Sequence, residues 1–278
     1  MKPGKYCDYH GNEYQLFALA MNPETQEPTV IYHPLGQDDK LLVCPVSAWE
    51  GSVTVNGISK PRFTYVSMPY TNDLSRLWYE GDASDWEQAL EHYHTLYQDA
   101  DLEREMEELQ WESVEQKRDW EFYTFLKEKY FVWKYTAKNR LGSTLKQLKF
   151  YEESGQRGEL DAIQSKIFSS DRTDISAMLQ VTGQIRGLGI AGASGLLSIL
   201  FPELYGTVDQ FVVKSLSLID DLPEHDAVSK MNPEALTLKN GVLLEEILRR
   251  KAKDLNRAFG TQAWTPRKID MVLWSFGR

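Results

Sequence analysis

The chain changes its periodicity part-way along, and this change constrains the fold more than any other feature. Short β-branched and aromatic runs separated by turn signals occupy residues 1–65, whereas residues 119–278 show helical stripes and no alternating run. One early run, residues 52–55, alternates with period two and precedes Asn56-Gly57, a dipeptide that favours hairpins because both residues tolerate positive φ. The pattern predicts an α+β protein in which a small N-terminal β barrel-like domain precedes an all-α domain.

Two helix starts are marked by a capping residue followed by proline. Thr265-Pro266 opens the last helix, whose apolar residues recur at helical spacing. Asn232-Pro233 has the same form, so we expect another helix to begin there.

The charge changes sign along the chain. Residues 1–118 carry 9 Lys and Arg against 21 Asp and Glu, whereas residues 119–278 carry 22 against 20. All of the net charge of -10 therefore arises in the first part, and basic clusters such as residues 249–253 remain available for phosphate. We expect domains at residues 1–66 and 119–278, joined by an acidic helical connector at residues 67–118 that is either a solvated helix or an acidic arm that mimics or repels nucleic acid.

The composition excludes several classes of protein. Two cysteines are too few for a disulfide scaffold, a four-cysteine zinc site or a cysteine-ligated iron–sulfur cluster. His92 and His94 come closest to metal-ligand spacing, but side chains two apart on a helix point different ways, so we expect no metal and no cofactor. No apolar run approaches about 18 residues and the N-terminus lacks the apolar region of a signal peptide, so we expect a cytoplasmic protein.

The N-terminal segment carries four short motifs: GKY at residues 4–6, YHGNEY at 9–14, VIY at 30–32 and PRF at 61–63. Together they resemble a small bacterial domain family of unknown function whose members read roughly GKYxHYKGxxY…VVY…PRF. The resemblance covers about residues 3–65 and brings no known activity. Because the segment shows no nucleophile–base pair, we expect an accessory β domain, with a protein partner as the alternative use.

The most informative segment follows residue 185. Gly187-Leu188-Gly189 separates two helical stretches, and the second stretch is rich in Gly, Ala and Ser. Glycines allow a tight turn that exposes consecutive N–H groups, and at the start of a helix such groups bind phosphate. Asp209 stands at the mouth of the next helix, 20 residues after Gly189. The residues expected to contact nucleic acid are Gly187, Gly189, Ile190, Ala191 and Gly192.

This arrangement resembles the helix–hairpin–helix DNA glycosylase superfamily, whose pattern is LPGVG-x-K-x-A followed one helix later by V-D-T/Q-H/F-V. Here Gly187-Leu188-Gly189 matches the hairpin and the run VDQFV at 208–212 matches the aspartate segment at the family interval. The resemblance implies a helical glycosylase-like domain at residues 119–278, with its motifs confined to 185–214. It further implies that Asp209 stabilises an oxocarbenium-like sugar and orients water while a flipped base departs.

The chain also departs from the family pattern. Ala191 stands where bifunctional members place a Schiff-base lysine, and Arg186 replaces the usual hairpin proline. The iron–sulfur cysteines of one branch are absent as well. A monofunctional glycosylase remains compatible with these departures, whereas the loss of the lysine at Ala191 and the overall acidity favour a non-catalytic nucleic-acid-binding module.

Further pocket residues have both a functional and a structural interpretation. Trp133, Lys134 and Tyr135 form an aromatic and cationic cluster that can stack on a base or can simply be half-buried, and Gln210 adjoins Asp209. Asp209 can likewise be only a helix N-cap. Asp270 is either a second carboxylate or a surface acid.

The preferred hypothesis is excision of a damaged or modified base from DNA, most simply double-stranded DNA, with Asp209 as the essential acid. The alternative is a non-catalytic nucleic-acid-binding module whose β domain recruits a partner. A third hypothesis is a helical protein that binds no nucleic acid.

Overall fold

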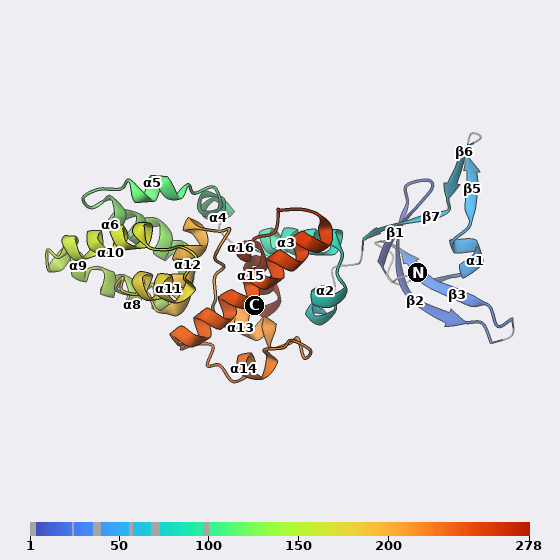
Figure 1. Ribbon diagram of the computed structural model, residues 1–278. Helices are drawn as coiled ribbons and strands as arrows, with labels where there is room; N and C mark the ends of the chain where they lie inside the picture. Colours follow the sequence, from blue (N-terminus) through green and yellow to red (C-terminus); the bar gives the residue numbers. More distant parts are fainter. Residues whose placement is uncertain (1–3, 24, 36–39, 56–57, 68–72, 97–99) are drawn as a thin grey trace. The chain divides into compact units, whose positions relative to one another are not determined.

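The computed structural model describes residues 4–23, 25–35, 40–55, 58–67, 73–96 and 100–278. The chain divides into two compact units, residues 1–88 and residues 89–278 (Figure 1). The expected hairpin dipeptide Asn56-Gly57 lies outside the described residues.

An antiparallel sheet forms the N-terminal unit. Five strands pair in the order β4-β3-β2-β1-β7, and β5 pairs with β6 in a separate hairpin. The strands are β1 (Gly4–Asp8), β2 (Glu13–Met21), β3 (Pro28–Pro34), β4 (Leu42–Pro45), β5 (Ser52–Val55), β6 (Ile58–Pro61) and β7 (Phe63–Ser67), with helix α1 (Val46–Trp49) after β4. Within the described residues β4 and β7 end the sheet without pairing to each other, so it is an open sheet rather than a closed barrel.

Aromatic side chains form the core of this unit. Trp49 is buried, and its ring stacks on that of Phe63 with centroids 3.8 Å apart and planes inclined by 8°. Tyr6 meets Trp49 edge-on with centroids 5.1 Å apart. Offset stacked and edge-on pairs of this kind add stability beyond the area they bury, which compensates for the small size of the unit.

Helix α2 (Leu74–Glu80) belongs to the first unit, and α3 (Ala83–Leu96) crosses the division between the units. The regular elements in the described residues of the second unit are all helices. Its further elements are α4 (Ala100–Glu107), α5 (Trp111–Glu115), α6 (Glu121–Phe125), the π-helix η1 (Leu126–Tyr130), α7 (Phe131–Lys134), α8 (Lys138–Leu148), α9 (Phe150–Glu153), α10 (Arg157–Ser169), α11 (Ile175–Thr182), α12 (Ile190–Leu200), α13 (Gln210–Leu216), α14 (His225–Ser229), α15 (Leu238–Phe259) and α16 (Pro266–Gly277).

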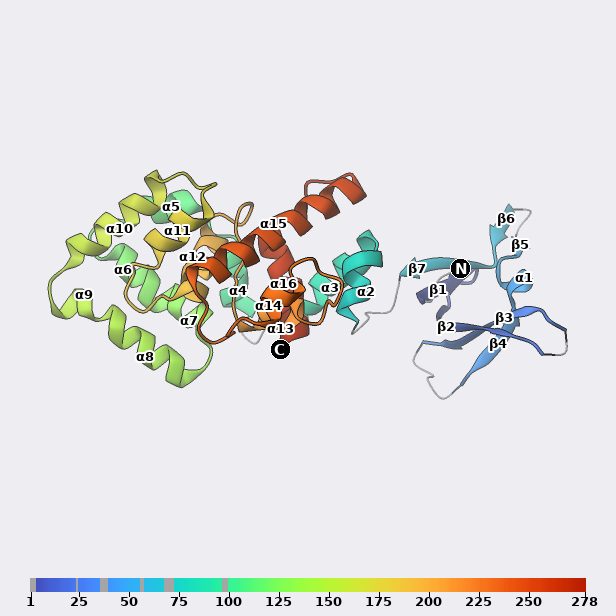
Figure 2. The same ribbon diagram turned by 60° about the horizontal axis from the view of Figure 1, so that its bottom comes forward.

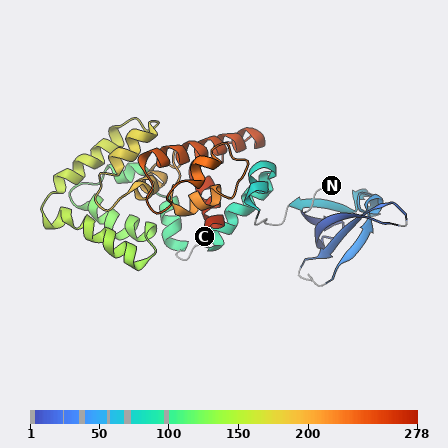
Figure 3. The ribbon, with the colours of Figure 1, turned by 90° about the horizontal axis from the view of Figure 1, so that it is seen from below.

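Helix α12 lies between two groups of helices in the second unit. The green and yellow helices α5–α11 lie on one side of it and the orange and red helices α13–α16 on the other (Figures 2 and 3). Every residue of α12 from Gly192 to Leu200 is buried. The small side chains expected in this helix therefore allow it to be surrounded on all sides.

Helix starts follow side-chain capping. The Thr265 side chain accepts a hydrogen bond from the Lys268 N–H at 3.3 Å, which confirms the predicted start of the last helix. The helix predicted at Asn232 is wrong, because Asn232 closes a turn with the N–H of Glu234 and α15 begins only after Thr237. Thr237 and Asn240 form a reciprocal capping box there, which satisfies two backbone donors where Asn232 would satisfy one.

The acidic segment before residue 118 differs from the expected solvated connector. Residues 89–118 belong to the helical unit, and Met106 and Val114 are buried in its core. Glu103, in the middle of the acidic run, is also buried. Among the described helices, none combines the length and the apolar character that crossing a membrane requires.

Candidate active site

A tight hairpin joins α11 to α12 at the glycines that the sequence singled out. Gly187 adopts a φ of +92°, a region that favours glycine. A Cβ at this position would lie 2.8 Å from the Thr144 carbonyl oxygen and 3.1 Å from the Phe131 ring. Both the conformation and the close packing therefore require glycine at residue 187.

Two tyrosines hold the hairpin against the preceding helices. The Tyr130 hydroxyl donates to the Gly192 carbonyl oxygen, and the Tyr135 hydroxyl donates to that of Gly187 at 3.3 Å. A Cβ on Gly192 would lie 2.5 Å from the Tyr135 hydroxyl, so this residue is buried against Tyr135. Tyr135 thus supports the hairpin.

The start of α12 faces outward. Gly189 is exposed and caps the helix, while Ile190 and Ala191 are partly buried. The first N–H groups of an α-helix have no partner within the helix, so this turn retains the donors that an anion requires. Of the five residues expected to contact nucleic acid, Gly192 is the one that the structure buries.

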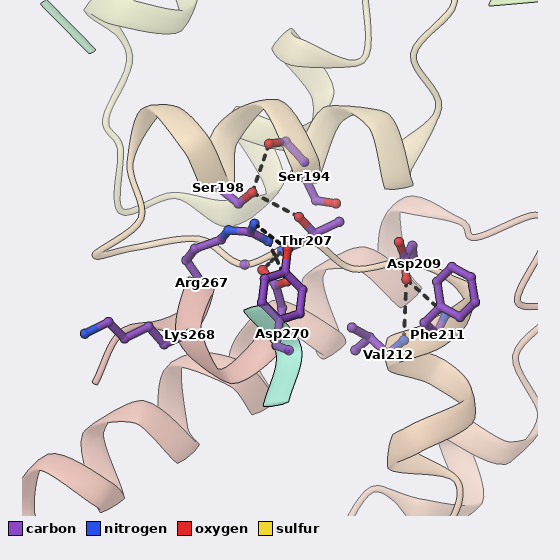
Figure 4. Close-up of polar contacts among 12 residues, drawn as sticks. Ser194, Ser198, Thr207, Asp209, Phe211, Val212, Arg267, Lys268 and Asp270 are labelled. Atoms are coloured by element: carbon purple, nitrogen blue, oxygen red, sulfur yellow. Dashed lines mark hydrogen bonds and ion pairs between the residues drawn. The ribbon is translucent and has the colours of Figure 1, made fainter. Parts of the chain in front are cut away.

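Asp209 uses its two oxygens differently. Oδ1 accepts hydrogen bonds from the N–H groups of Phe211 at 2.9 Å and Val212 at 3.4 Å, which caps α13 (Figure 4). Oδ2 lies 2.9 Å from Nζ of Lys134, and 14% of the Asp209 side chain and 9% of the Lys134 side chain are exposed. Asp209 is therefore both an N-cap and one half of a shielded ion pair.

The segment that carries Asp209 is tied to α12. The Val208 N–H donates to Oγ of Ser194 at 3.0 Å, and the Ser198 and Thr207 hydroxyls lie 3.0 Å apart. Ser194 lies five residues after Gly189, about 7.5 Å along the helix axis. These contacts hold the hairpin and the aspartate segment in one rigid arrangement.

A cavity of about 490 Å³ opens beside this ion pair. Asp209, Lys134 and Trp133 line it, and Tyr135 and Gln210 are not among its lining residues. The remaining walls are mainly aromatic and apolar, with contributions from Tyr93, Leu102, Val132, Phe211, Val212 and Trp274. Of the four residues expected in a base pocket, Trp133 and Lys134 therefore line the same cavity as Asp209. The aromatic lining suits a flat aromatic ligand.

Buried charges form the polar part of the cavity. Arg267 pairs with Asp270 at 2.8 Å and with Glu103 at 2.6 Å. Trp133 donates from Nε1 to Glu103 at 2.5 Å. The Thr207 N–H donates to Asp270 at 2.5 Å (Figure 4). Asp270 is therefore an interior carboxyl and not a surface acid. Burial raises the pKa of Asp270 to about 7, although the neighbouring Arg267 lowers it.

Sequence reasoning missed Arg267 and Glu103. Arg267 follows the capping pair Thr265-Pro266, which identifies a helix start but not the direction of the side chain. Glu103 lies in a run of acidic residues, and nothing in the sequence distinguishes it from the others as the buried one. The pairing joins residues 164 apart in the chain, so no local pattern indicates it.

A basic surface adjoins the hairpin. Residues 129–151 contain six Lys and Arg and no Asp or Glu, and α8 lies within this stretch. Thr144 belongs to α8, and its carbonyl oxygen is the atom that packs closest to Gly187. Four cations of the stretch are exposed and make no ion pair within the described part of the chain: Lys138, Arg140, Lys146 and Lys149.

Two arginines of the basic cluster at residues 249–253 have structural roles. Arg249 donates to the carbonyl oxygens of Leu204 at 2.6 Å and Thr173 at 3.1 Å. Arg250 makes two hydrogen bonds of 2.7 Å to Glu224. These two arginines are therefore engaged in contacts within the protein, whereas Lys253 is exposed.

Metal ligation finds no support in the described residues, which contain no group of three or more His, Cys, Asp or Glu placed to hold an ion. His94 instead lies 3.0 Å from Glu107.

Comparison with known proteins identifies the family to which the N-terminal sheet is similar. Residues 4–65 match the model of a family described as proteins of unknown function, DUF1653. The N-terminal segment is a DUF1653 domain. A crystal structure of a DUF1653 protein from Bordetella bronchiseptica is 29% identical, with 26% of this chain and 94% of that chain covered and a TM-score of 0.23. No curated protein is significantly similar to the chain. The DUF1653 match ends at residue 65 and does not reach the helical unit.

Proposed function

We propose that the helical unit is a monofunctional DNA glycosylase that hydrolyses the N-glycosidic bond of a damaged or modified base. The observation that carries this proposal is the position of Asp209, which lines an aromatic cavity and is tied through Ser194 to the glycine hairpin. A nucleotide flipped out of a duplex would place its base in the cavity and its sugar beside the carboxylate.

The chemistry needs an anion beside the anomeric carbon. Cleavage of the bond leaves positive charge on the sugar, and a carboxylate that is both fixed and shielded stabilises that charge strongly. Asp209 meets both conditions, because its side chain is largely shielded and its Oδ1 is held by two N–H groups. Water can then add to the cation from the open side of the cavity.

Binding of DNA would use the surface beside this cavity. The first turn of α12 offers N–H groups to one phosphate, and the exposed cations of α8 can neutralise others. The acidic total of -10 does not oppose this, since no acid lies in residues 129–151.

The test is a single-turnover assay on duplexes that carry different modified bases, with alkali used to cleave abasic product. Asp209→Asn keeps an N-cap, since Asn caps helices as well as Asp does, but it removes the negative charge. We expect excision to fall by about 10²–10³-fold. Asp254→Asn is the matched control, because Asp254 is exposed on α15, pairs with Arg257 and does not line the cavity. Unchanged excision by Asp209→Asn would remove the catalytic assignment.

A non-catalytic nucleic-acid-binding module is the second candidate. The DUF1653 sheet exposes large apolar side chains on β2 and β4, namely Phe17, Leu19, Met21 and Val43, which suits recruitment of a protein partner. Both candidates predict DNA binding that weakens with salt, and only the first predicts abasic product. Saturated binding without abasic product across the duplex panel would favour the second.

A further inference from the structure

Lys134 lines the cavity beside Asp209, and packing fixes its position. Its stem passes α12 where glycine leaves room, since a Cβ on Gly195 would lie 3.1 Å from Cδ and 3.2 Å from Cε. The preceding Trp133 and Tyr130 bond to Glu103 and Gly192. The ammonium group therefore has a defined position, 2.9 Å from Asp209 and facing the cavity.

This position creates an electrostatic conflict for the proposed reaction. Asp209 is already neutralised by Lys134 before any substrate enters. A cation that develops on the sugar would then be attracted less strongly by Asp209, because that carboxylate is already paired. The same cation would also be repelled by the ammonium group of Lys134, which has the same charge. The other charges at the cavity are the Arg267–Asp270 pair, which is satisfied internally, and Arg278, which donates to the Leu96 carbonyl. Transfer of a proton from Lys134 during the reaction would remove this conflict.

We propose that Lys134 is the proton donor to the departing base, an inference that rests on the glycosylase function above. As the bond from C1′ to the base nitrogen breaks, its electron pair stays on the base, and that base takes a proton from Nζ. The amine becomes neutral and Asp209 is released to face the sugar cation. Water then adds to C1′ and returns a proton to the amine, so the net change is sugar–base plus water to abasic sugar plus free base.

The proton donor defines a substrate class. A neutral base would leave as an anion and so benefits from protonation, whereas a base with a fixed positive charge leaves as a neutral molecule. General acid catalysis typically contributes about 10²–10⁴-fold. Lys134 therefore matters for neutral leaving bases and much less for cationic ones.

The experiment compares two probes in the full chain: a duplex with hypoxanthine, which is neutral, and a duplex with N7-methylguanine, which is cationic. Lys134→Met should lower single-turnover excision of hypoxanthine at least about 100-fold and that of N7-methylguanine less than about fivefold. Lys134→Arg keeps a cation beside Asp209 but cannot release a proton, so it should show the same selective loss. The matched control is Lys230→Met, since Lys230 is exposed and lies outside both the cavity and residues 129–151.

The outcomes separate this inference from the function on which it rests. Equal losses on both probes, wild-type hypoxanthine excision by Lys134→Arg, or excision of N7-methylguanine alone by the wild type would each overturn the proton donor and leave glycosylase activity standing. A borohydride-trapped DNA adduct on Lys134 would also overturn it, because the amine would then be the nucleophile. Absence of abasic product from every duplex in the panel would remove both proposals.

Discussion

Replacement of Gly187 by alanine tests whether the hairpin is fixed by its backbone. At a φ of +92° a residue with a Cβ is strained, which costs about 1–3 kcal/mol. The Cβ would also lie 2.8 Å from the Thr144 carbonyl, and forced packing of this kind costs about 1–3 kcal/mol more. We therefore expect Gly187→Ala to lower the free energy of unfolding of the helical unit by about 2–6 kcal/mol.

Gly142→Ala is the matched control. Gly142 is in α8, is exposed, and would place its Cβ within 4 Å of nothing. Alanine is favoured over glycine inside a helix by about 1 kcal/mol, so this variant should be slightly more stable than the wild type. Urea unfolding of the full chain, followed by helical circular dichroism, measures both. A loss below about 1 kcal/mol in Gly187→Ala, or an equal loss in Gly142→Ala, would refute the argument.

Two further predictions concern the charges around the cavity and on α8. Burial raises the pKa of Asp270 from 3.8 to about 7, so the folded protein holds this proton more tightly than the unfolded chain, and the resulting stability is lost as pH rises between those values. The variant Asp270→Asn leaves Arg267, Glu103, Asp209 and Lys134 in place but cannot titrate. As pH rises from 5 to 8, its free energy of unfolding should therefore increase by about 1–3 kcal/mol relative to that of the wild type, as measured by urea titration. Parallel dependence of the two free energies on pH would contradict this. For the basic surface, Lys138→Glu with Arg140→Glu should make the logarithm of DNA affinity less dependent on salt, with a slope smaller by about 0.9 for each phosphate that the variant no longer neutralises, in fluorescence anisotropy. Lys253→Glu is the control on α15, and an unchanged salt slope in the α8 variant would exclude that surface.

Local chemistry explains which parts of the fold were predictable. Gly187 and Gly189 predicted a turn between two helices, and the structure has one there, because a positive φ and a helix start are properties of a few adjacent residues. Strands β1 and β7, each five residues long, were not predicted individually, whereas the shorter β5 was, because its residues alternate clearly. They are held by pairing with each other across more than fifty residues of sequence, as in the partners Cys7 and Thr64.

The end of the connector was misjudged for a related reason. Charge dominates residues 101–109, and the few apolar side chains among them are equally compatible with a solvated helix. Burial of Met106 depends on the core of the helical unit, to which no local pattern points. Likewise the aromatic neighbours of Lys134 indicate a pocket residue, whereas its pairing with Asp209, 75 residues away, depends on the tertiary fold.

The divided use of the Asp209 oxygens has a consequence for the energy of any reaction in the cavity. Because Oδ1 is engaged by the start of α13, the carboxylate cannot swing aside without uncapping a helix. A mobile carboxylate would lose conformational entropy when it binds a transition state. Here that entropy is already lost when the chain folds. A ligand that reaches Oδ2 contacts an oxygen whose orientation is already fixed. Its binding free energy is therefore not reduced by the cost of ordering the carboxylate.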